Sequence, residues 1–346
     1  MERAALVGGV ILAIVMALSS LGHESWHFTI DGEDIEFGRG RAAYVEPAAG
    51  RLAAATYAGD EVRVIHAAAV VVVTPEDRAD ISVEIDNPGR TPMPEVTASG
   101  GRVTIDGRLA GRIDNCTESG AVSLDGYGEI ARSDLPRITI RAPRALAMSL
   151  RGAAFGEIGP SQSAKLDFAG CGDSTVGDVA GRLEINAAGS GDIRAGAAGE
   201  VDADQAGSGT VTVGVVAGGL NVDIAGSGAF TAASINGALE ANLAGSGDVT
   251  INGGAVTEAS VDIAGSGDVV IAAPVTRLET DILGSGGVDV RGVVGDVEAS
   301  VAGSGDVMVD SVTGRLEQSS MGSGRVITRN RASAPAPAPA PAPPPR

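Results

Sequence analysis

The sequence predicts an all-β protein in which residues 135–330 wind into a parallel β-helix, a stack of coils that pair with one another. Three observations predict this fold. The tripeptide Gly-Ser-Gly returns about every 19 residues, apolar and polar side chains alternate on both sides of it, and the 346 residues include 51 glycines but only nine aromatics. With so few bulky side chains, the core must be built from many small ones along a long surface.

The repeat is marked by Gly-Ser-Gly, whose first residue we call the landmark glycine. Successive landmarks are 18 to 20 residues apart, a regularity that indicates a repeat architecture. The variant Gly170-Cys171-Gly172 is a ninth copy, so we expect about nine coils of about 19 residues. The landmark glycines of the eight Gly-Ser-Gly copies are Gly189, Gly207, Gly226, Gly245, Gly265, Gly284, Gly303 and Gly322.

Apolar residues recur six and two positions before the landmark, and four and six positions after it. This period of two is the signal of a β-strand. Nineteen extended residues cover roughly 63 Å, so a chain that returns to an equivalent place must bend at least twice per repeat. Gly-Ser-Gly supplies one bend. The inward residues six positions before the landmark are Leu183, Val201, Leu220, Leu239, Leu278, Val297 and Leu316.

Other repeat architectures do not fit this pattern. A leucine-rich repeat needs a Leu-x-x-Leu-x-Leu-x-x-Asn framework, and the calcium-binding nonapeptide array has a period of nine. A phosphate-binding loop needs a lysine and a following helix, which the tandem Gly-Ser-Gly copies lack.

Residues 23–134 are predicted to form an irregular β segment that begins the stack and caps its N-terminal end, because an open row of strand edges invites aggregation. Strands are expected over residues 67–73, 81–85, 101–105 and 137–140. The repeat pattern first becomes recognisable around residues 154–158.

The two ends of the chain carry their own signals. Residues 4–18 are apolar or glycine, which predicts that segment 1–22 is a cleaved secretory signal or an uncleaved N-terminal anchor. Either alternative exports the rest of the chain. Residues 331–346 are rich in alanine and proline, which predicts an extended, unpaired and disordered tail.

Cys116 and Cys171 are the two cysteines of the chain. They are too few for a disulfide framework and lack the spacing of metal ligands. One disulfide in an exported chain and two buried thiols both remain open.

Acidic residues occupy three outward positions of the repeat, which stacking would align into three columns. The simplest interpretation is a solvated surface that keeps a strand-rich protein soluble. The sharper hypothesis is that the columns bind Ca²⁺, in which case millimolar Ca²⁺ raises the melting temperature. The acids lie five positions before the landmark (Glu184, Asp202, Glu240, Glu279, Glu298, Glu317), three before it (Asp204, Asp223, Asp262, Asp281) and three after it (Asp173, Asp192, Asp248, Asp268, Asp306).

The composition excludes several classes of function. A net charge of −19 argues against a general binder of nucleic acid or of anionic lipid. The histidines are His23, His27 and His66, and the one lysine is Lys165, so the repeats hold no His-based catalytic or metal set. We therefore assign no catalytic, cofactor-binding or metal-binding residues.

The repeated Ala-Gly-Ser-Gly-Asp-Val at residues 244–249 and 264–269, with Leu-Pro-Arg-Ile-Thr-Ile-Arg-Ala-Pro at 135–143, resembles the bacterial GIN-type domain, a family described as an autotransporter adhesin head. The resemblance covers about residues 40–330. It implies an exported, right-handed β-helix without an assigned activity, and it supplies no catalytic residues. The chain departs from the family in Cys171 and in its Ala-Pro tail.

These observations together predict a non-enzymatic, exported β-helix of the periplasm or cell surface, an adhesin-like binding or structural module. Its exposed coil faces would contact surface glycans or envelope proteins, and its membrane contact would be limited to the N-terminal segment. The alternatives are a polysaccharide-active enzyme, since many β-helices act on polysaccharides, and a periplasmic scaffold or sensor.

Overall fold

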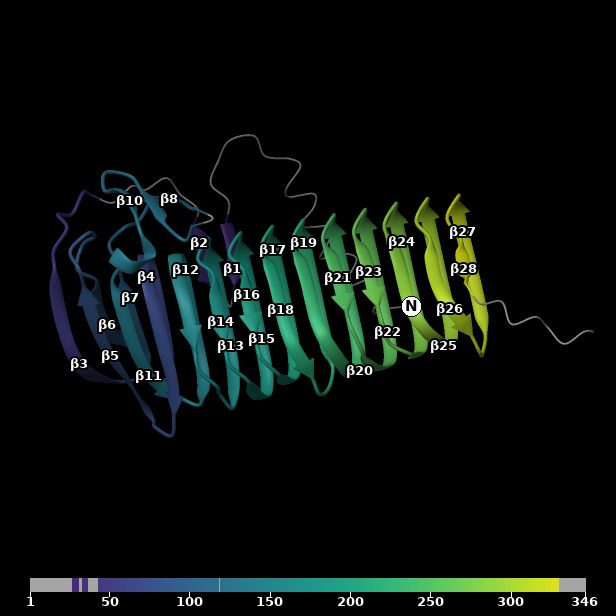
Figure 1. The fold of residues 1–346 in the computed structure, drawn as a ribbon, viewed down its shortest axis with the longest axis horizontal. Coiled ribbons are helices and arrows are strands. Elements are labelled where there is room, and N and C mark those ends of the chain that lie inside the picture. Colours follow the sequence, from purple (N-terminus) through teal and green to yellow (C-terminus); the bar gives the residue numbers. More distant parts are fainter. Residues whose placement is uncertain (1–26, 31–32, 37–42, 118, 330–346) are drawn as a thin grey trace, which may run out of the picture. The chain divides into compact units, whose positions relative to one another are not determined.

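The computed structural model describes residues 27–30, 33–36, 43–117 and 119–329. The predicted signal or anchor (1–22) and the Ala-Pro tail (331–346) lie outside these residues, so the expectations for them stay predictions. The described residues are almost entirely strands, joined by turns and one short 3-10 turn, Arg132–Asp134 (Figure 1). No helix in this part of the chain is long and apolar enough to cross a membrane.

Internal contacts divide the chain into two units. The first comprises Met1–Gly196 with Asp204–Val211, and the second comprises Ala197–Ala203 with Thr212–Arg346. Strands β17 (Ala198–Gly207) and β18 (Thr210–Val216) supply residues to both. Each unit is described by itself.

In the first unit, parallel strands stack as coils from β4 onward. The long strand β12 pairs with β4 on one side and with β13 and β14 on the other, and β15 and β16 continue the stack. The predicted strand over 67–73 lies within β4, and it is confirmed. The bounds are β4 (Glu61–Glu76), β12 (Ala145–Ile158), β13 (Ser163–Gly170), β14 (Ser174–Val176), β15 (Val179–Gly189) and β16 (Ile193–Ala195).

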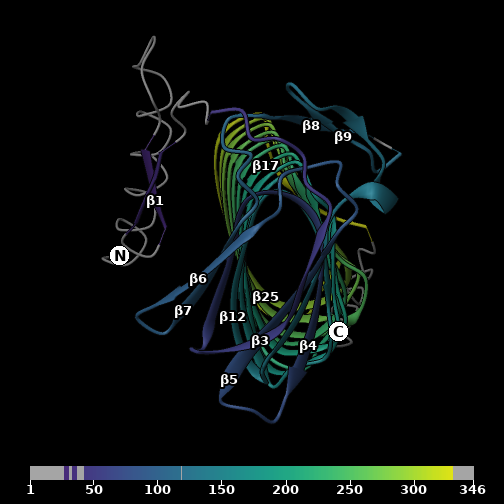
Figure 2. The same ribbon diagram turned by 90° about the vertical axis from the view of Figure 1, so that its left-hand side faces the viewer.

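An antiparallel cap covers the start of this stack, as predicted (Figure 2). Strands β7 and β11 pair with the two halves of β4 in parallel, after which β6 pairs with β7, and β5 with β11, in the antiparallel sense. Strand β3 adds to β5. The predicted strands over 81–85, 101–105 and 137–140 correspond to β5, β7 and β11. The bounds are β3 (Gly50–Ala58), β5 (Asp80–Asn87), β6 (Glu95–Ser99), β7 (Arg102–Asp106) and β11 (Arg137–Pro143), with a separate hairpin of β1 (His27–Ile30) and β2 (Glu33–Glu36).

A small antiparallel sheet, which we call the flap, lies between β7 and β11 in the sequence. It consists of β8 (Ile113–Cys116), β9 (Val122–Leu124) and β10 (Gly128–Ile130). Its buried residues pack with Leu109, Ala153 and Phe155 in one hydrophobic cluster. The sequence carries no signal that separates this flap from the predicted cap.

The second unit repeats the parallel coil. Landmark glycines pair with landmark glycines from coil to coil, for example Gly245 with Gly265 and Gly265 with Gly284. This register confirms the predicted stacking of equivalent positions. The bounds are β19 (Leu220–Gly226), β20 (Ala229–Gly245), β21 (Asp248–Ile251), β22 (Gly254–Gly265), β23 (Asp268–Ile271), β24 (Val275–Gly284), β25 (Gly287–Gly303), β26 (Val307–Val312), β27 (Leu316–Gly322) and β28 (Val326–Thr328).

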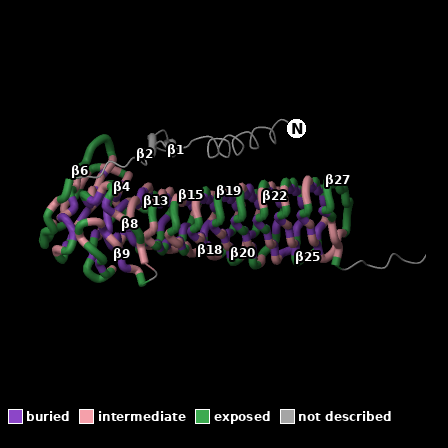
Figure 3. Tube along the Cα trace, turned by 90° about the horizontal axis from the view of Figure 1, so that it is seen from above, coloured by how far each residue is buried: buried purple, intermediate pink, exposed green. Residues whose placement is uncertain are grey.

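The core follows the predicted alternation (Figure 3). Leu278 six positions before a landmark and Val269 four positions after one are both fully buried, whereas the residues beside them face outward. Leu316 differs, because it belongs to the last described coil and is 44% exposed. Short aliphatic side chains therefore fill the interior of each unit, as the composition predicts.

The landmark glycine is required by stacking as well as by the turn. All nine have φ between +129° and +145°, a region that other residues rarely adopt. A Cβ at Gly265 would overlap the carbonyl oxygen of Gly245 and lie 2.9 Å from its carbonyl carbon. That oxygen accepts a hydrogen bond from the N–H of Ser266 at 2.8 Å. The corner of one coil therefore rests directly on the backbone of the corner before it.

The repeat begins one coil earlier than the sequence pattern indicates. Gly152 pairs in register with Gly170, has φ of +104° and accepts a hydrogen bond from the N–H of Cys171 at 3.1 Å. It is followed by two alanines, so it lacks the Ser-Gly signature that marks the later corners. The prediction that the pattern starts around 154–158 is corrected to a corner at Gly152.

Candidate binding surface

The outward acids form columns in the second unit. In the column five positions before the landmark, Glu279 pairs in register with Glu298, which pairs with Glu317. Arg277 contacts this column, with its guanidinium nitrogens 3.8 Å from a carboxylate oxygen of Glu279 and 3.5 Å from one of Glu298. The same guanidinium lies 3.9 Å from Glu258. Exposed ion pairs of this kind contribute little to stability, but they lower the repulsion between neighbouring carboxylates.

The column three positions before the landmark is compensated by amides over part of its length. The side-chain amide of Asn242 donates to the carboxylate of Asp223 at 2.7 Å, and in the first unit Asn186 donates to Asp167 at the same distance. Each bond joins one coil to the coil before it. An asparagine between two aspartates thus replaces a repulsion with a hydrogen bond.

Asp262 and Asp281 break this alternation, because they are register neighbours with no asparagine between them. Partial burial raises the pKa of Asp262, and the negative charges of Asp281 and Glu279 raise it further. We call the outward face formed by Glu240, Asp262, Glu279, Asp281 and Glu298 the acidic strip. Its negative charge is retained at a cost in stability, since two such charges at the spacing of adjacent strands repel by roughly 1 kcal/mol in water.

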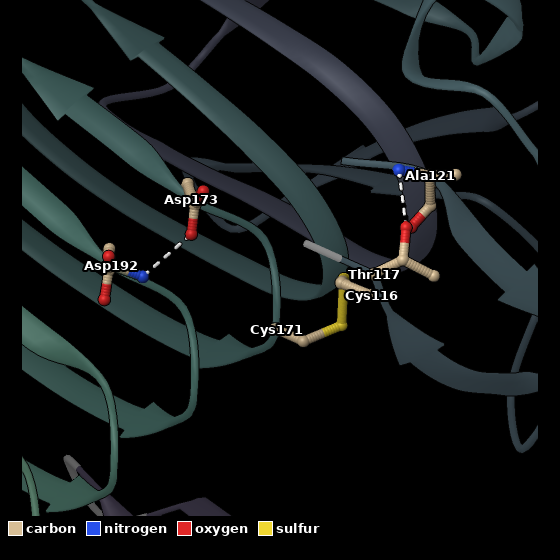
Figure 4. Close-up of a disulfide and its surroundings, with 6 residues drawn as sticks. All are labelled: Cys116, Thr117, Ala121, Cys171, Asp173 and Asp192. Carbon is tan, nitrogen blue, oxygen red and sulfur yellow. Dashed lines mark hydrogen bonds between the residues drawn. A yellow bond between two sulfur atoms is a disulfide. The ribbon is translucent and has the colours of Figure 1, made fainter. Parts of the chain in front are cut away.

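The aspartates three positions after the landmark have a structural role. A carboxylate oxygen of Asp173 accepts the backbone N–H of Asp192 at 2.9 Å (Figure 4). Asp248 accepts the N–H of Asp268 at the same distance, and Asp268 accepts the N–H of Gly287 at 2.8 Å. Each such bond ties the start of one strand to the coil before it, and this contact favours the simple interpretation of the column over a metal site.

The calcium hypothesis remains a prediction. Across residues 43–117 and 119–329, no group of three or more His, Cys, Asp and Glu is placed to hold a metal ion. The carboxylate oxygens of Asp173, Asp248 and Asp268 that accept backbone N–H groups also point along the stack, toward the next coil. A calcium-dependent rise in melting temperature is still the measurement that decides it.

The question of the cysteines is answered by a disulfide between Cys116 and Cys171, with Cα atoms 5.6 Å apart and 55 residues between them in the sequence (Figure 4). Cys116 ends strand β8 of the flap, and Cys171 is the middle residue of the variant landmark tripeptide. Both pack against the flap's hydrophobic cluster. The replacement of serine by cysteine at this one corner therefore fastens the flap to the coil.

Two tyrosines of the first unit, Tyr44 and Tyr127, pack together beside the same flap. The rings of Tyr44 and Tyr127 stack with centroids 5.0 Å apart, and the guanidinium of Arg112 lies 5.6 Å from the centre of the Tyr44 ring. The Tyr127 hydroxyl donates to the backbone carbonyl of Val45 at 2.7 Å. These contacts occupy the polar group of Tyr127 and join the flap to the segment before β3.

A shallow groove of about 420 Å³ also lies on the first unit, along β12, β13 and β15. Its wall carries charges of both signs, including Lys165, Arg182 and Glu184. The Lys165 ammonium lies 3.1 Å from the Glu184 carboxylate. Lys165 is the one lysine of the chain, and nothing in the sequence around it indicates that it lies in a groove.

The structure thus defines a class: an all-β solenoid of stacked parallel coils with an antiparallel cap and charged columns on its outer strands. The chain belongs to the family described as "Putative auto-transporter adhesin, head GIN domain", whose profile matches residues 95–255 and 220–332. The resemblance noted in the repeats is confirmed.

Solved structures are also similar. One is described as a "Putative lipid binding protein" from Parabacteroides distasonis ATCC 8503, at 17% identity and a TM-score of 0.39, covering 82% of this chain and 99% of that one. A "putative adhesin" of the same organism has 16% identity and a TM-score of 0.38 over 82% and 98% of the two chains. A "putative adhesin" of Bacteroides fragilis NCTC 9343 has 12% identity and a TM-score of 0.34 over 82% and 100%. No curated protein matches the chain.

Proposed function

We propose that the protein is an exported, non-enzymatic, adhesin-like module of the cell envelope that binds surface glycans through the outer faces of its coils. Family membership carries the proposal, because the family is described as the head of an adhesin. The outer faces fit this role, since stacking repeats the same side chain at the strand spacing of about 4.8 Å and so offers a polymer a row of equivalent contacts.

The acidic strip and the groove are the two surfaces that we expect to make these contacts. Carboxylates accept hydrogen bonds from sugar hydroxyls, and the strip offers them on neighbouring coils, as at Glu279 and Glu298. The groove adds donors from Lys165 and Arg182. A glycan chain lying along either surface would meet polar groups of adjacent strands at once.

The test is a glycan array probed with the purified chain, followed by titration of the best binders. Three paired variants separate the surfaces. Glu279→Gln with Glu298→Gln alters the strip, and Lys165→Gln with Arg182→Gln alters the groove. Glu95→Gln with Glu129→Gln removes two exposed charges elsewhere and serves as the control, since both are exposed residues on short strands of the first unit.

Saturable binding that one surface pair weakens at least tenfold, and that the control pair leaves unchanged, supports the proposal. Equal loss in all variants would indicate non-specific charge attraction and would count against it. Release of reducing or unsaturated ends from uronate polymers would show an enzyme instead. If the chain bound neither to any glycan of the array nor to intact cells, the adhesin-like role would be overturned.

A further inference from the structure

A small cavity of about 20 Å³ lies at the landmark corner of the first unit. Residues two positions before the landmark line it, among them Phe168, Ala187 and Gln205. Glycines two positions after the landmark line it as well, among them Gly191 and Gly209. A polar cavity needs about 10–15 Å³ to hold one water molecule, whereas an apolar cavity stays dry. The polar groups of the wall therefore decide what this cavity can bind.

In the second unit an aliphatic side chain fills the equivalent corner. Ile263, two positions before its landmark, has its Cγ2 atom 2.9 Å from the place that a Cβ on Gly286 of the next coil would occupy. Ala187 has the position of Ile263 in the first unit, and Gly209 has that of Gly286. The three atoms nearest to the place of a Cβ on Gly209 are all backbone atoms of the preceding coil. The short side chain of Ala187 therefore leaves space beside this glycine.

Gln205 supplies a polar side chain to this cavity. It has the same position in the repeat as Ile263, and it is only 5% exposed. Its side-chain nitrogen donates to the carbonyl oxygen of Gly209. Its Oε1 atom is buried and has no hydrogen-bond partner among the residues that the structure describes. A buried acceptor without a donor is costly, so such atoms are bonded to the protein or to ordered water in most structures.

We propose that this cavity is a binding site for one internal water molecule, which Gln205 holds in the corner of the coils. The water donates one hydrogen to Oε1 of Gln205 and the other to a backbone carbonyl of the lining glycines. A carbonyl oxygen has two lone pairs, so one that already accepts a bond within the stack can accept a second. No aspartate or glutamate is among the residues that line the cavity, so the ligand is neutral water and not a metal ion.

The experiment is nuclear magnetic resonance of the full chain labelled with nitrogen-15 in its three glutamines, Gln162, Gln205 and Gln318. Gln162 and Gln318 are exposed and serve as internal controls. A long-lived internal water should give the side-chain amide of Gln205 strong laboratory-frame and rotating-frame Overhauser cross-peaks of opposite sign. The amides of the two exposed glutamines contact only short-lived surface water, so their cross-peaks should be weak.

Two substitutions test the site itself. Ala187→Val fills part of the cavity, so it should abolish the water cross-peak of Gln205 and lower the melting temperature, because Oε1 loses its donor. In a chain that also carries Gln205→Leu, Ala187→Val should not lower the melting temperature, since no buried acceptor is left. Ala225→Val, at an outward position of the second unit, is the matched control and should leave the cross-peak unchanged.

Three results would overturn the proposal. The first is a water cross-peak of Gln205 that is no stronger than those of Gln162 and Gln318 in the unmodified chain. The second is a cross-peak that persists in Ala187→Val. The third is a rise in melting temperature on Ala187→Val alone, which would show that the cavity is dry and that filling it only adds packing.

Discussion

Replacing both cysteines of the Cys116–Cys171 disulfide by serine isolates the contribution of the cross-link. Serine is the residue found at the middle of every other landmark tripeptide, so Cys171→Ser should fit its corner without rearrangement. The second substitution, Cys116→Ser, changes the last residue of strand β8 in the flap. The hydrophobic cluster that holds the flap keeps all its other members in this variant.

The magnitude follows from the length of the closed loop. A separation of 55 residues between the cysteines gives a loop-closure entropy worth about 4 kcal/mol at 25 °C if the unfolded state is a random chain. Residual contacts in the unfolded first unit reduce this figure, so we expect the free energy of unfolding to fall by about 2–4 kcal/mol.

Guanidinium unfolding followed by far-ultraviolet circular dichroism measures the change. Wild-type protein with its disulfide reduced should unfold at the same midpoint as the double serine variant, since both lack only the cross-link. Hydrogen exchange should accelerate first in the flap, the element that the disulfide fastens. A loss below 1 kcal/mol, or faster exchange spread evenly over the whole unit, would refute the reasoning.

Three further predictions rest on the second unit. Gly265→Ala should lower the free energy of unfolding by about 3 kcal/mol or more, because a Cβ at this positive φ would overlap the backbone of the preceding coil. The control Ser266→Ala should change the free energy of unfolding by less than about 0.5 kcal/mol. Chemical denaturation measures both changes. Asp262→Asn should raise the melting temperature at neutral pH by removing roughly 1 kcal/mol of repulsion. Because the pKa of Asp262 is raised in the folded protein, this gain should vanish as the pH falls below about 3.9, and a gain that persists there would contradict the electrostatic reason. Arg277→Gln should destabilise by at most about 1 kcal/mol, with an effect that shrinks in 1 M salt.

Periodicity predicted the coils well because one inward pattern repeats many times. Alternation around the landmark identified the buried positions, as Leu278 and Val269 show. It could not identify the corner at Gly152, where alanines take the place of Ser-Gly. A single glycine carries a weak signal, and only its pairing with Gly170 reveals its role.

The cap and the disulfide needed information that the sequence does not carry. The segment before residue 135 has strands without a period, so their antiparallel order depends on long-range pairing. Two cysteines 55 residues apart give no sign of proximity until the flap is placed on the coil. The acidic columns were predictable from spacing, but the bond from Asp173 to the backbone of Asp192 was not, because it depends on the exact height of one coil above another.

The register between β20 and β22 shifts between Gly237 and Leu239. At this point the chain accommodates one residue more than the neighbouring coil has. The same coil pair has the 20-residue interval from Gly245 to Gly265, yet these two glycines still align. In this pair of coils the extra residue is thus accommodated at the bend opposite the landmark. Insertions grafted at that bend, such as an epitope or a fluorophore-binding tag, should leave the corner glycines aligned, and the protein could lengthen in evolution by duplicating whole repeats.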